Sequence, residues 1–143
     1  MKFSILLLLS VIFSVSYCYT YKTNQGIIIL NDTNLDIAKR SWNHLLVNFD
    51  GGCKWCIQFR AYYLDAYKEA KALPQTYTSR FCQMDLKTNP QSKALYKIEH
   101  HPTQLLFVRF DPKSPYKYTG TKNKTKLLAW LKQKLADVRK AGY

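Results

Sequence analysis

Hydrophobic residues along the chain occur in two patterns, short β-branched runs and longer stretches with helical spacing. The runs are bounded by Gly, Pro, Asn or Asp, which is typical of buried strands. Strands are predicted at residues 26–30, 45–49, 81–85, 104–110 and 116–118. Helices are predicted at residues 33–42, 53–73, 89–98 and 124–139. The polar residues 19–25 are predicted to be a loose lead-in without regular structure.

Three of the predicted helices carry an apolar face. The face of the long second helix consists of Phe59, Tyr62, Tyr63, Ala66, Tyr67 and Ala70. The face of the last helix consists of Leu127, Leu128, Leu131, Leu135 and Val138. The helix that begins at Pro90 has a smaller apolar side of Ala94, Leu95 and Ile98. Strands and helices alternate until a final hairpin and helix, which predicts an α/β layer fold with a mixed central sheet flanked by helices.

The first 18 residues differ from the rest and are predicted to be a signal peptide. A short start with one Lys precedes an apolar run of about 11 residues, whereas a transmembrane anchor, the alternative, needs roughly 20. We expect cleavage after Ser16 or Cys18, which leaves one domain of residues 19–143. This domain is expected in the secretory pathway, either in the endoplasmic reticulum lumen, secreted or vacuolar. The final residues Lys140–Tyr143 are not a KDEL-type retention signal.

The chain is strongly basic, with 22 Lys and Arg against 9 Asp and Glu and a formal net charge of +13. Loss of Lys2 with the signal peptide takes this to +12. Nine of the basic residues lie between Lys113 and Tyr143, with Asp137 as the one acid there. The simplest interpretation is a solvated helix face, and the alternative is a surface for acidic proteins or an acidic membrane. Secretion argues against nucleic acid, so no nucleic-acid partner is expected.

Cys53 and Cys56 enclose Lys54 and Trp55, and this C-x-x-C lies between a predicted strand and the start of a predicted helix. Free N–H groups and the helix dipole favour an anion at a helix N-terminus, which lowers the pKa of a thiol placed there. Cys53 is therefore the predicted nucleophile and Cys56 the resolving thiol, which together form a redox disulfide. Lys54 adds a cation that would stabilise the thiolate.

Other uses of the cysteine pair remain open from the residues alone. A zinc site needs two further ligands, for which the candidates are Cys82, His100, His101 and His44. None of these forms a second paired motif, so the favoured interpretation has no metal and no dissociable cofactor. A purely structural disulfide closing so small a loop would stabilise the fold little. Cys82, on a predicted central strand, is expected to be a buried small hydrophobic residue.

Several motifs in order resemble the thioredoxin superfamily, in particular a single thioredoxin domain of the protein disulfide isomerase group. The resemblance covers about residues 26–140. Besides the C-x-x-C, it rests on Leu45–Phe49, Cys82–Asp85, His101-Pro102-Thr103 before a strand, Tyr118-Thr119-Gly120 and Trp130-Leu131. The resemblance implies a three-layer thioredoxin-like fold.

The same resemblance implies how substrates bind. Pro102 would be a cis-proline that faces the cysteines and positions an extended substrate chain, with His101 and Trp55 beside it. The implied partners are proteins that carry thiols or disulfides, together with a separate redox partner.

The sequence departs from the family pattern around the cysteines. Gly52 stands where the family has Trp, and the loop before Cys53 is one residue short. Asn48 stands where the family has a buried acid that exchanges a proton with the second cysteine, and a neutral amide cannot accept that proton. Asp50 is close enough in sequence to substitute, but a solvated turn residue is expected. Trp55 replaces the His that stabilises a thiolate in oxidase-like members.

These features predict a protein disulfide oxidoreductase or isomerase that reduces, forms or isomerises protein disulfides, with activity weakened by the departures. The alternative is a thioredoxin-like binding subunit or chaperone cofactor of a secretory or vacuolar complex, with weak or no redox activity.

Overall fold

The computed structural model describes residues 19–143, so the predicted signal peptide of residues 1–18 lies outside the described part. The strands are β1 (Lys22–Asn24), β2 (Ile27–Leu30), β3 (His44–Asp50), β4 (Arg80–Asp85), β5 (Thr103–Val108) and β6 (Tyr116–Lys117). The helices are α1 (Leu35–Ser41), α2 (Lys54–Ala70), α3 (Pro90–Leu95) and α4 (Lys124–Lys140). Among residues 19–143, no helix combines the length and the apolar character that crossing a membrane requires.

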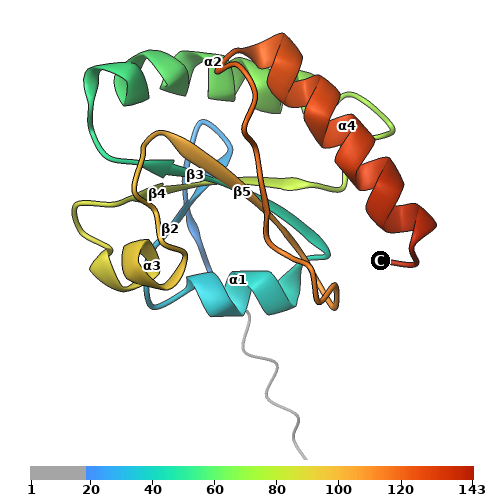
Figure 1. The fold of residues 1–143 in the computed structure, drawn as a ribbon, viewed down its shortest axis with the longest axis horizontal. Coiled ribbons are helices and arrows are strands. Elements are labelled where there is room, and N and C mark those ends of the chain that lie inside the picture. The colour runs from blue at the N-terminus through green and yellow to red at the C-terminus, as the bar shows by residue number, and fades with distance from the viewer. Residues whose placement is uncertain (1–18) are drawn as a thin grey trace, which may run out of the picture.

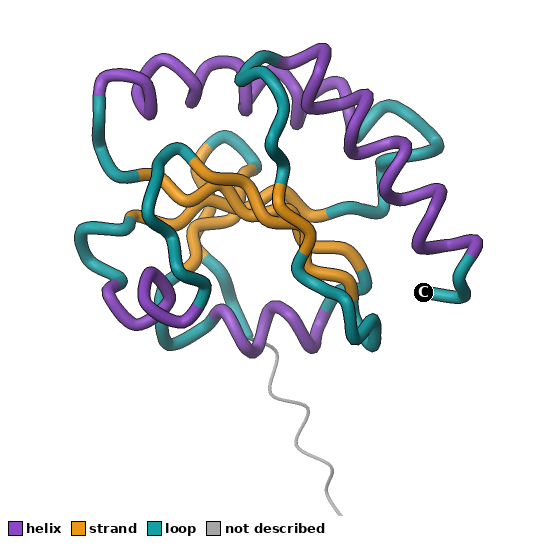
Figure 2. Tube along the Cα trace, in the orientation of Figure 1, coloured by secondary structure: helices purple, strands orange, loops and turns teal. Residues whose placement is uncertain are grey.

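The strands form one mixed sheet in the order β1-β2-β4-β3-β5-β6. Strands β2, β4 and β3 run parallel, whereas β1, β5 and β6 pair antiparallel with their neighbours. Every residue of β3 is buried, because this strand lies between β4 and β5 and is covered on both faces. Figure 2 shows the strands as a central layer with helices on either side.

Each face of the sheet is covered by two helices (Figure 1). Helices α2 and α4 cover one face, and the predicted apolar stripe of α4 is buried there in full. Helices α1 and α3 lie on the other face, where α1 buries Leu35 and Ala38 against a second core cluster. The structure therefore confirms the predicted three-layer α/β fold. Successive side chains of β3 point to opposite faces of the sheet. Leu45, Val47 and Phe49 therefore lie in the core on the α1 face, and Leu46 lies in the core under α2 and α4.

The prediction of a loose lead-in at residues 19–25 is wrong, because β1 pairs with β2 in a hairpin. Gln25 and Gly26 form its two-residue turn, and both have positive φ, at 51° and 89°. Such turns match the twist of paired strands, and Gly adopts this backbone without strain. All three residues of β1 are exposed, so the strand carries no hydrophobic pattern.

Three predicted helical features also need correction. Helix α2 ends at Ala70, three residues earlier than expected, where the Thr76 hydroxyl donates to the Ala70 carbonyl at 2.7 Å. Tyr62 is 39% exposed, outside the buried face of α2. Helix α3 stops at Leu95, which is 69% exposed, and the chain then turns so that Ile98 alone of the predicted apolar side is buried.

Candidate redox site

The two cysteines of the C-x-x-C lie at the start of α2, directly after the central strand β3. Cys53 is the N-cap of α2, and its Sγ accepts a hydrogen bond from the backbone N–H of Cys56 at 3.0 Å. The two residues are joined by a disulfide, with 4.9 Å between their Cα atoms. Cys53 is partly exposed and Cys56 is fully buried. The predicted nucleophile is thus the more accessible sulfur, and a free helical N–H points at it.

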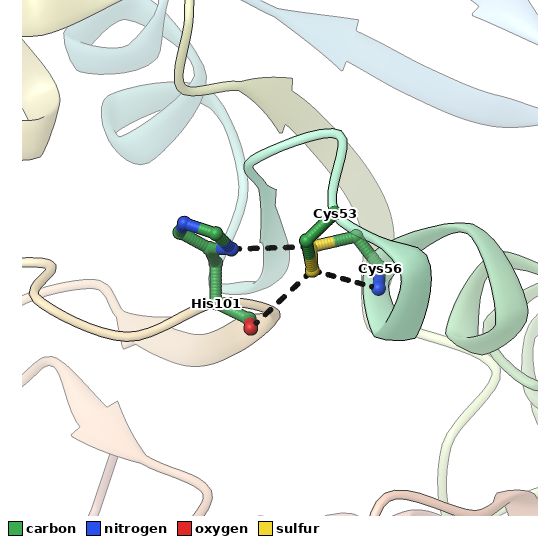
Figure 3. A group of neighbouring side chains, drawn as sticks. All are labelled: Cys53, Cys56 and His101. Atoms are coloured by element: carbon green, nitrogen blue, oxygen red, sulfur yellow. Dashed lines mark hydrogen bonds between the residues drawn. A yellow bond between two sulfur atoms is a disulfide. The ribbon is translucent and has the colours of Figure 1, made fainter.

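His101 lies against both sulfurs (Figure 3). Its Nδ1 is 3.4 Å from the Sγ of Cys56, and its backbone oxygen is 3.7 Å from the Sγ of Cys53. The peptide bond between His101 and Pro102 is cis. The imidazole packs against Gly51, where a Cβ atom would lie 2.6 Å from three ring atoms. Glycine at residue 51 therefore leaves the space that the ring occupies.

A hollow with a volume of about 320 Å³ lies between Trp55 of the C-x-x-C and Pro102. Its lining consists of Trp55, Gln58, Phe59, Tyr62, Pro102, Thr121 and Lys122. Of these residues, Trp55 is 67% exposed and Pro102 is buried. The structure therefore brings the predicted substrate-binding residues Trp55 and Pro102 to one place, and Tyr62, assigned by sequence to the core, lies there too.

Asp50 is a buried ion-pair partner, so the expectation of a solvated turn residue is wrong. Its side chain is 2% exposed, and both carboxylate oxygens accept hydrogen bonds from Arg60 of α2. The backbone N–H of Gly52 also donates to Asp50 at 2.7 Å. Burial alone would raise the pKa of this carboxyl, but the hydrogen bonds from Arg60 and Gly52 outweigh burial and lower the pKa. This pair fixes the loop before Cys53 to the first turns of α2.

Asn48 on β3 and Gln104 on β5 form a second buried polar contact. Together with Asp50, Arg60 and Lys122, these residues are called the polar layer below. Gln104 Nε2 donates to Asn48 Oδ1 at 2.8 Å, and both residues are fully buried. Lys122 donates to Gln104 Oε1 at 2.6 Å. Burial of the ammonium group, helped by the charge of Lys117, lowers the pKa of Lys122 to about 8. The position where the resemblance implied a buried acid is thus held by Asn48, which is hydrogen-bonded to Gln104.

The other candidate residues lie apart from the sulfurs. Cys82 is buried on the α1 and α3 face of the sheet, as predicted, and burial raises its pKa well above the usual value. His44 begins β3, at the end of the strand remote from the cysteines. His100 precedes His101 but does not belong to its cluster with the two sulfurs. Lys54 is exposed and makes no side-chain hydrogen bond or ion pair within residues 19–143, so its role stays a prediction.

Sequence reasoning missed the roles of Arg60, Gln104 and Lys122. Arg60 is a polar residue of α2 outside its buried apolar face, and nothing in the nearby sequence marks its pairing with Asp50. The one signal in the sequence is Gln104, a polar residue of β5 that directly precedes the apolar residues 105–108. A buried polar group requires a partner, which is what Asn48 provides.

Comparison with known proteins defines the class of fold. No family model matches the chain. The first thioredoxin domain of mouse Protein disulfide-isomerase A4 superimposes with a TM-score of 0.70 and 18% identity, covering 81% of this chain and 80% of that one. The J-Trx1 fragment of ERdj5 gives a TM-score of 0.67 and 21% identity, covering 78% of this chain and 52% of that one. The protein therefore has the thioredoxin fold.

Within that fold, the resemblance to protein disulfide isomerase-type domains is confirmed. Protein disulfide-isomerase of Gallus gallus is 23% identical over 132 residues, which are 92% of this chain. The match spans 25% of that relative's length. The chain is thus similar to one quarter of this larger protein.

Proposed function

We propose that the chain is a thiol–disulfide oxidoreductase that acts on protein substrates in the secretory pathway. The observation that carries the proposal is the Cys53–Cys56 disulfide at the N-terminus of α2, with the Cys56 N–H directed at the Cys53 sulfur. This environment favours a thiolate at Cys53 when the pair is reduced. The apolar segment within residues 1–18 supports the proposed compartment.

In the reducing direction, the Cys53 thiolate attacks one sulfur of a substrate disulfide. A mixed disulfide forms, and the other substrate sulfur leaves as a thiolate that takes up a proton. Cys56 then loses its proton and attacks the Cys53 sulfur, which closes the pair and releases the second substrate sulfur. The substrate gains two electrons and the pair loses two, so a redox partner must reduce the pair again. Oxidation of a substrate is the same sequence in reverse.

The second step requires a proton acceptor near Cys56. Asn48 cannot fill this role, because its amide oxygen already accepts from Gln104 and is not basic. His101 Nδ1 lies 3.4 Å from the Cys56 sulfur and is placed to accept the proton. The hollow beside Trp55, Tyr62 and Pro102 supports the binding of an extended substrate segment next to Cys53.

Insulin reduction or a scrambled-disulfide substrate tests the proposal. We expect turnover from the wild type and from Cys82→Ala, which removes the cysteine on the other face of the sheet. We expect none above background from the Cys53→Ser, Cys56→Ser double variant. A wild-type rate no higher than that of the double variant would refute the proposal. Thiol trapping against glutathione then gives the reduction potential and the favoured direction.

A redox-independent binding subunit or chaperone cofactor is the second candidate. The exposed apolar residues at the start of α2, Trp55 at 67% and Ile57 at 57%, favour it, because such a patch suits a protein partner. The exposed cations from Lys113 onward would add an acidic protein or membrane surface as a partner. Partner capture that survives in the double cysteine variant and disappears in Trp55→Ala would support this role.

A further inference from the structure

Cys53, Cys56 and His101 offer a metal ion three ligands at one point. Their sulfur and ring nitrogen atoms all lie within 4.8 Å of one another. The side chains converge from two separate parts of the chain, the start of α2 and the loop before β5 (Figure 3). No oxygen ligand takes part in this group, so its donor set is two sulfurs and one nitrogen.

The spacing suits tetrahedral zinc. Zinc binds thiolate sulfur at about 2.3 Å and imidazole nitrogen at about 2.0–2.1 Å, so neighbouring N and S ligands stand about 3.5 Å apart. The distance from His101 Nδ1 to the Cys56 Sγ is 3.4 Å. Two thiolate sulfurs bound to one tetrahedral zinc are about 3.8 Å apart. Reduction of the disulfide breaks the S–S bond and so allows the two sulfurs to move apart to this distance. Thiolate and imidazole donors select zinc over Mg²⁺ and Ca²⁺, which prefer oxygen.

The imidazole is already held where a ligand is needed. Gly51 leaves the space for the ring, since any Cβ there would come within 2.6 Å of it. His101 is exposed and Cys53 is partly exposed, so the fourth coordination position faces solvent. A water molecule or a side chain of a bound protein would complete the tetrahedron there.

We propose that the reduced form of this site binds one Zn²⁺ through Cys53 Sγ, Cys56 Sγ and His101 Nδ1. Binding converts two thiols to metal-bound thiolates and releases their protons to water, with no change of oxidation state. The disulfide form offers no thiolate and does not bind. Zinc occupies both sulfurs and the ring nitrogen beside them, so it holds the pair reduced and blocks disulfide exchange. The proposal does not require that the chain turn over substrates.

The full chain, reduced and then freed of reductant, is titrated with Zn²⁺ in competition with a chromophoric chelator. We expect one equivalent bound by the reduced protein and none by the oxidised protein. Co²⁺ as a spectroscopic probe should show sulfur-to-metal charge transfer and tetrahedral ligand-field bands. Loss of an outer-shell partner of a metal costs about 10–100-fold in affinity. We expect His101→Ala, which removes a direct ligand, to cost at least as much.

Two variants serve as matched tests of the imidazole. His100→Ala removes the neighbouring exposed histidine and should bind Zn²⁺ as the wild type does. Gly51→Ala keeps all three ligands but displaces the ring, and it should weaken binding in the direction of His101→Ala. Wild-type affinity in His101→Ala, binding by the oxidised chain, or no binding by the reduced chain would overturn the site. Circular dichroism of each variant shows whether the fold is retained.

The insulin assay in the presence of chelator separates this proposal from the proposed function. Zinc binding without turnover leaves the metal site in place and contradicts the oxidoreductase. Turnover without zinc binding contradicts the metal site alone. Where zinc binding and turnover both occur, added Zn²⁺ should inhibit turnover of the wild type and of His100→Ala. His101→Ala also lacks the proposed proton acceptor, so its turnover is compared with its own rate in chelator, and Zn²⁺ should lower that rate less.

Discussion

Cys56 and Cys82 are both fully buried, but Cys56 has polar neighbours and Cys82 lies among apolar side chains. Cys56 lies in the first turn of α2, bonded to Cys53 and 3.4 Å from an imidazole nitrogen. Cys82 lies in the middle of β4, in the apolar cluster under α1 and α3. The Sγ of Cys82 is 3.9 Å from the backbone oxygen of Arg80.

The comparison shows that burial alone does not decide what a thiol does. At Cys82 the charge of Arg80 compensates the loss of water only in part, so burial raises the pKa of the thiol well above its usual value and keeps it neutral. Around Cys56, the helix N-terminus, the second sulfur and His101 provide partners for a charged or bonded sulfur. A polar layer supports this end of the sheet, whereas apolar side chains surround Cys82.

The largest contrast is expected in turnover. Cys56→Ser leaves the attacking sulfur of Cys53 but removes the resolving sulfur, so the mixed disulfide with a substrate cannot close. We expect turnover to fall to background and a substrate-linked species to accumulate, visible on non-reducing gels and lost on reduction. Cys82→Ala should turn over at the wild-type rate. Equal loss of activity in both variants would show that the two cysteines do not differ as proposed.

Alkylation measures the same contrast in the wild type. In the reduced native protein we expect iodoacetamide to label Cys53 first. Cys82 should be labelled only when the domain unfolds, which protects it by about 10³-fold or more relative to denatured protein. Mass spectrometry of native and urea-unfolded samples gives both rates. Rapid labelling of Cys82 in the native state would mean that its core opens locally.

The ion pair beneath the redox site should dominate local stability. Asp50→Asn removes the charge that accepts from Arg60 and should lower the free energy of unfolding by about 1.5–3 kcal/mol at pH 7. The folded pKa of Asp50 is lowered, so its contribution is complete above the unfolded pKa of about 4 and is lost as pH falls through the folded pKa. Urea unfolding at pH 7 and below pH 4 measures the difference.

The matched control is Asp36→Asn on α1. Asp36 is 76% exposed and pairs with Lys39 at 3.5 Å, so its removal should change stability by less than about 0.5 kcal/mol at either pH. An Asp50 effect as small as that of Asp36 would contradict a supporting role for the buried pair.

The sequence was sufficient for features that depend on local pattern. The β-branched runs predicted the buried strands, and Pro90 is the first residue of α3, as predicted. The C-x-x-C between strand and helix placed both cysteines correctly, because strand, loop and helix are contiguous there. The buried state of Cys82 followed from its place on an apolar strand.

The features that were missed depend on contacts between distant residues. The partnership of Gln104 and Asn48 depends on the register of β5 against β3, which the hydrophobic pattern does not give to the nearest residue. The ring of His101 reaches the sulfurs because Gly51 has no side chain, and the two are 50 positions apart. Strand β1 was missed because an exposed edge strand needs no hydrophobic residues.

The smallest expected effects are changes of stability at alkaline pH, and they should have opposite signs on the two faces of the sheet. Burial lowers the pKa of Lys122 to about 8, so between about pH 8 and pH 10.5 the unfolded chain binds more protons and stability rises with pH. The pKa of Cys82 is raised, so above about pH 8.5 the unfolded chain binds fewer protons there and stability falls.

Single variants separate these two contributions. Lys122→Met should remove the rise, by about 1 kcal/mol because water screens this half-buried side chain. Lys126→Met, at an exposed lysine that does not contribute to the shifted pKa of Lys122, should leave the rise unchanged. Cys82→Ala should remove part of the fall and so make the alkaline stability curve flatter. Urea unfolding at pH 7.5, 9 and 10 resolves both. If both variants changed the alkaline pH dependence of the free energy of unfolding in the same direction, the polar layer near the cysteine pair and the apolar cluster around Cys82 would not differ electrostatically. That result would remove the physical basis for treating the thiols in these two places as different.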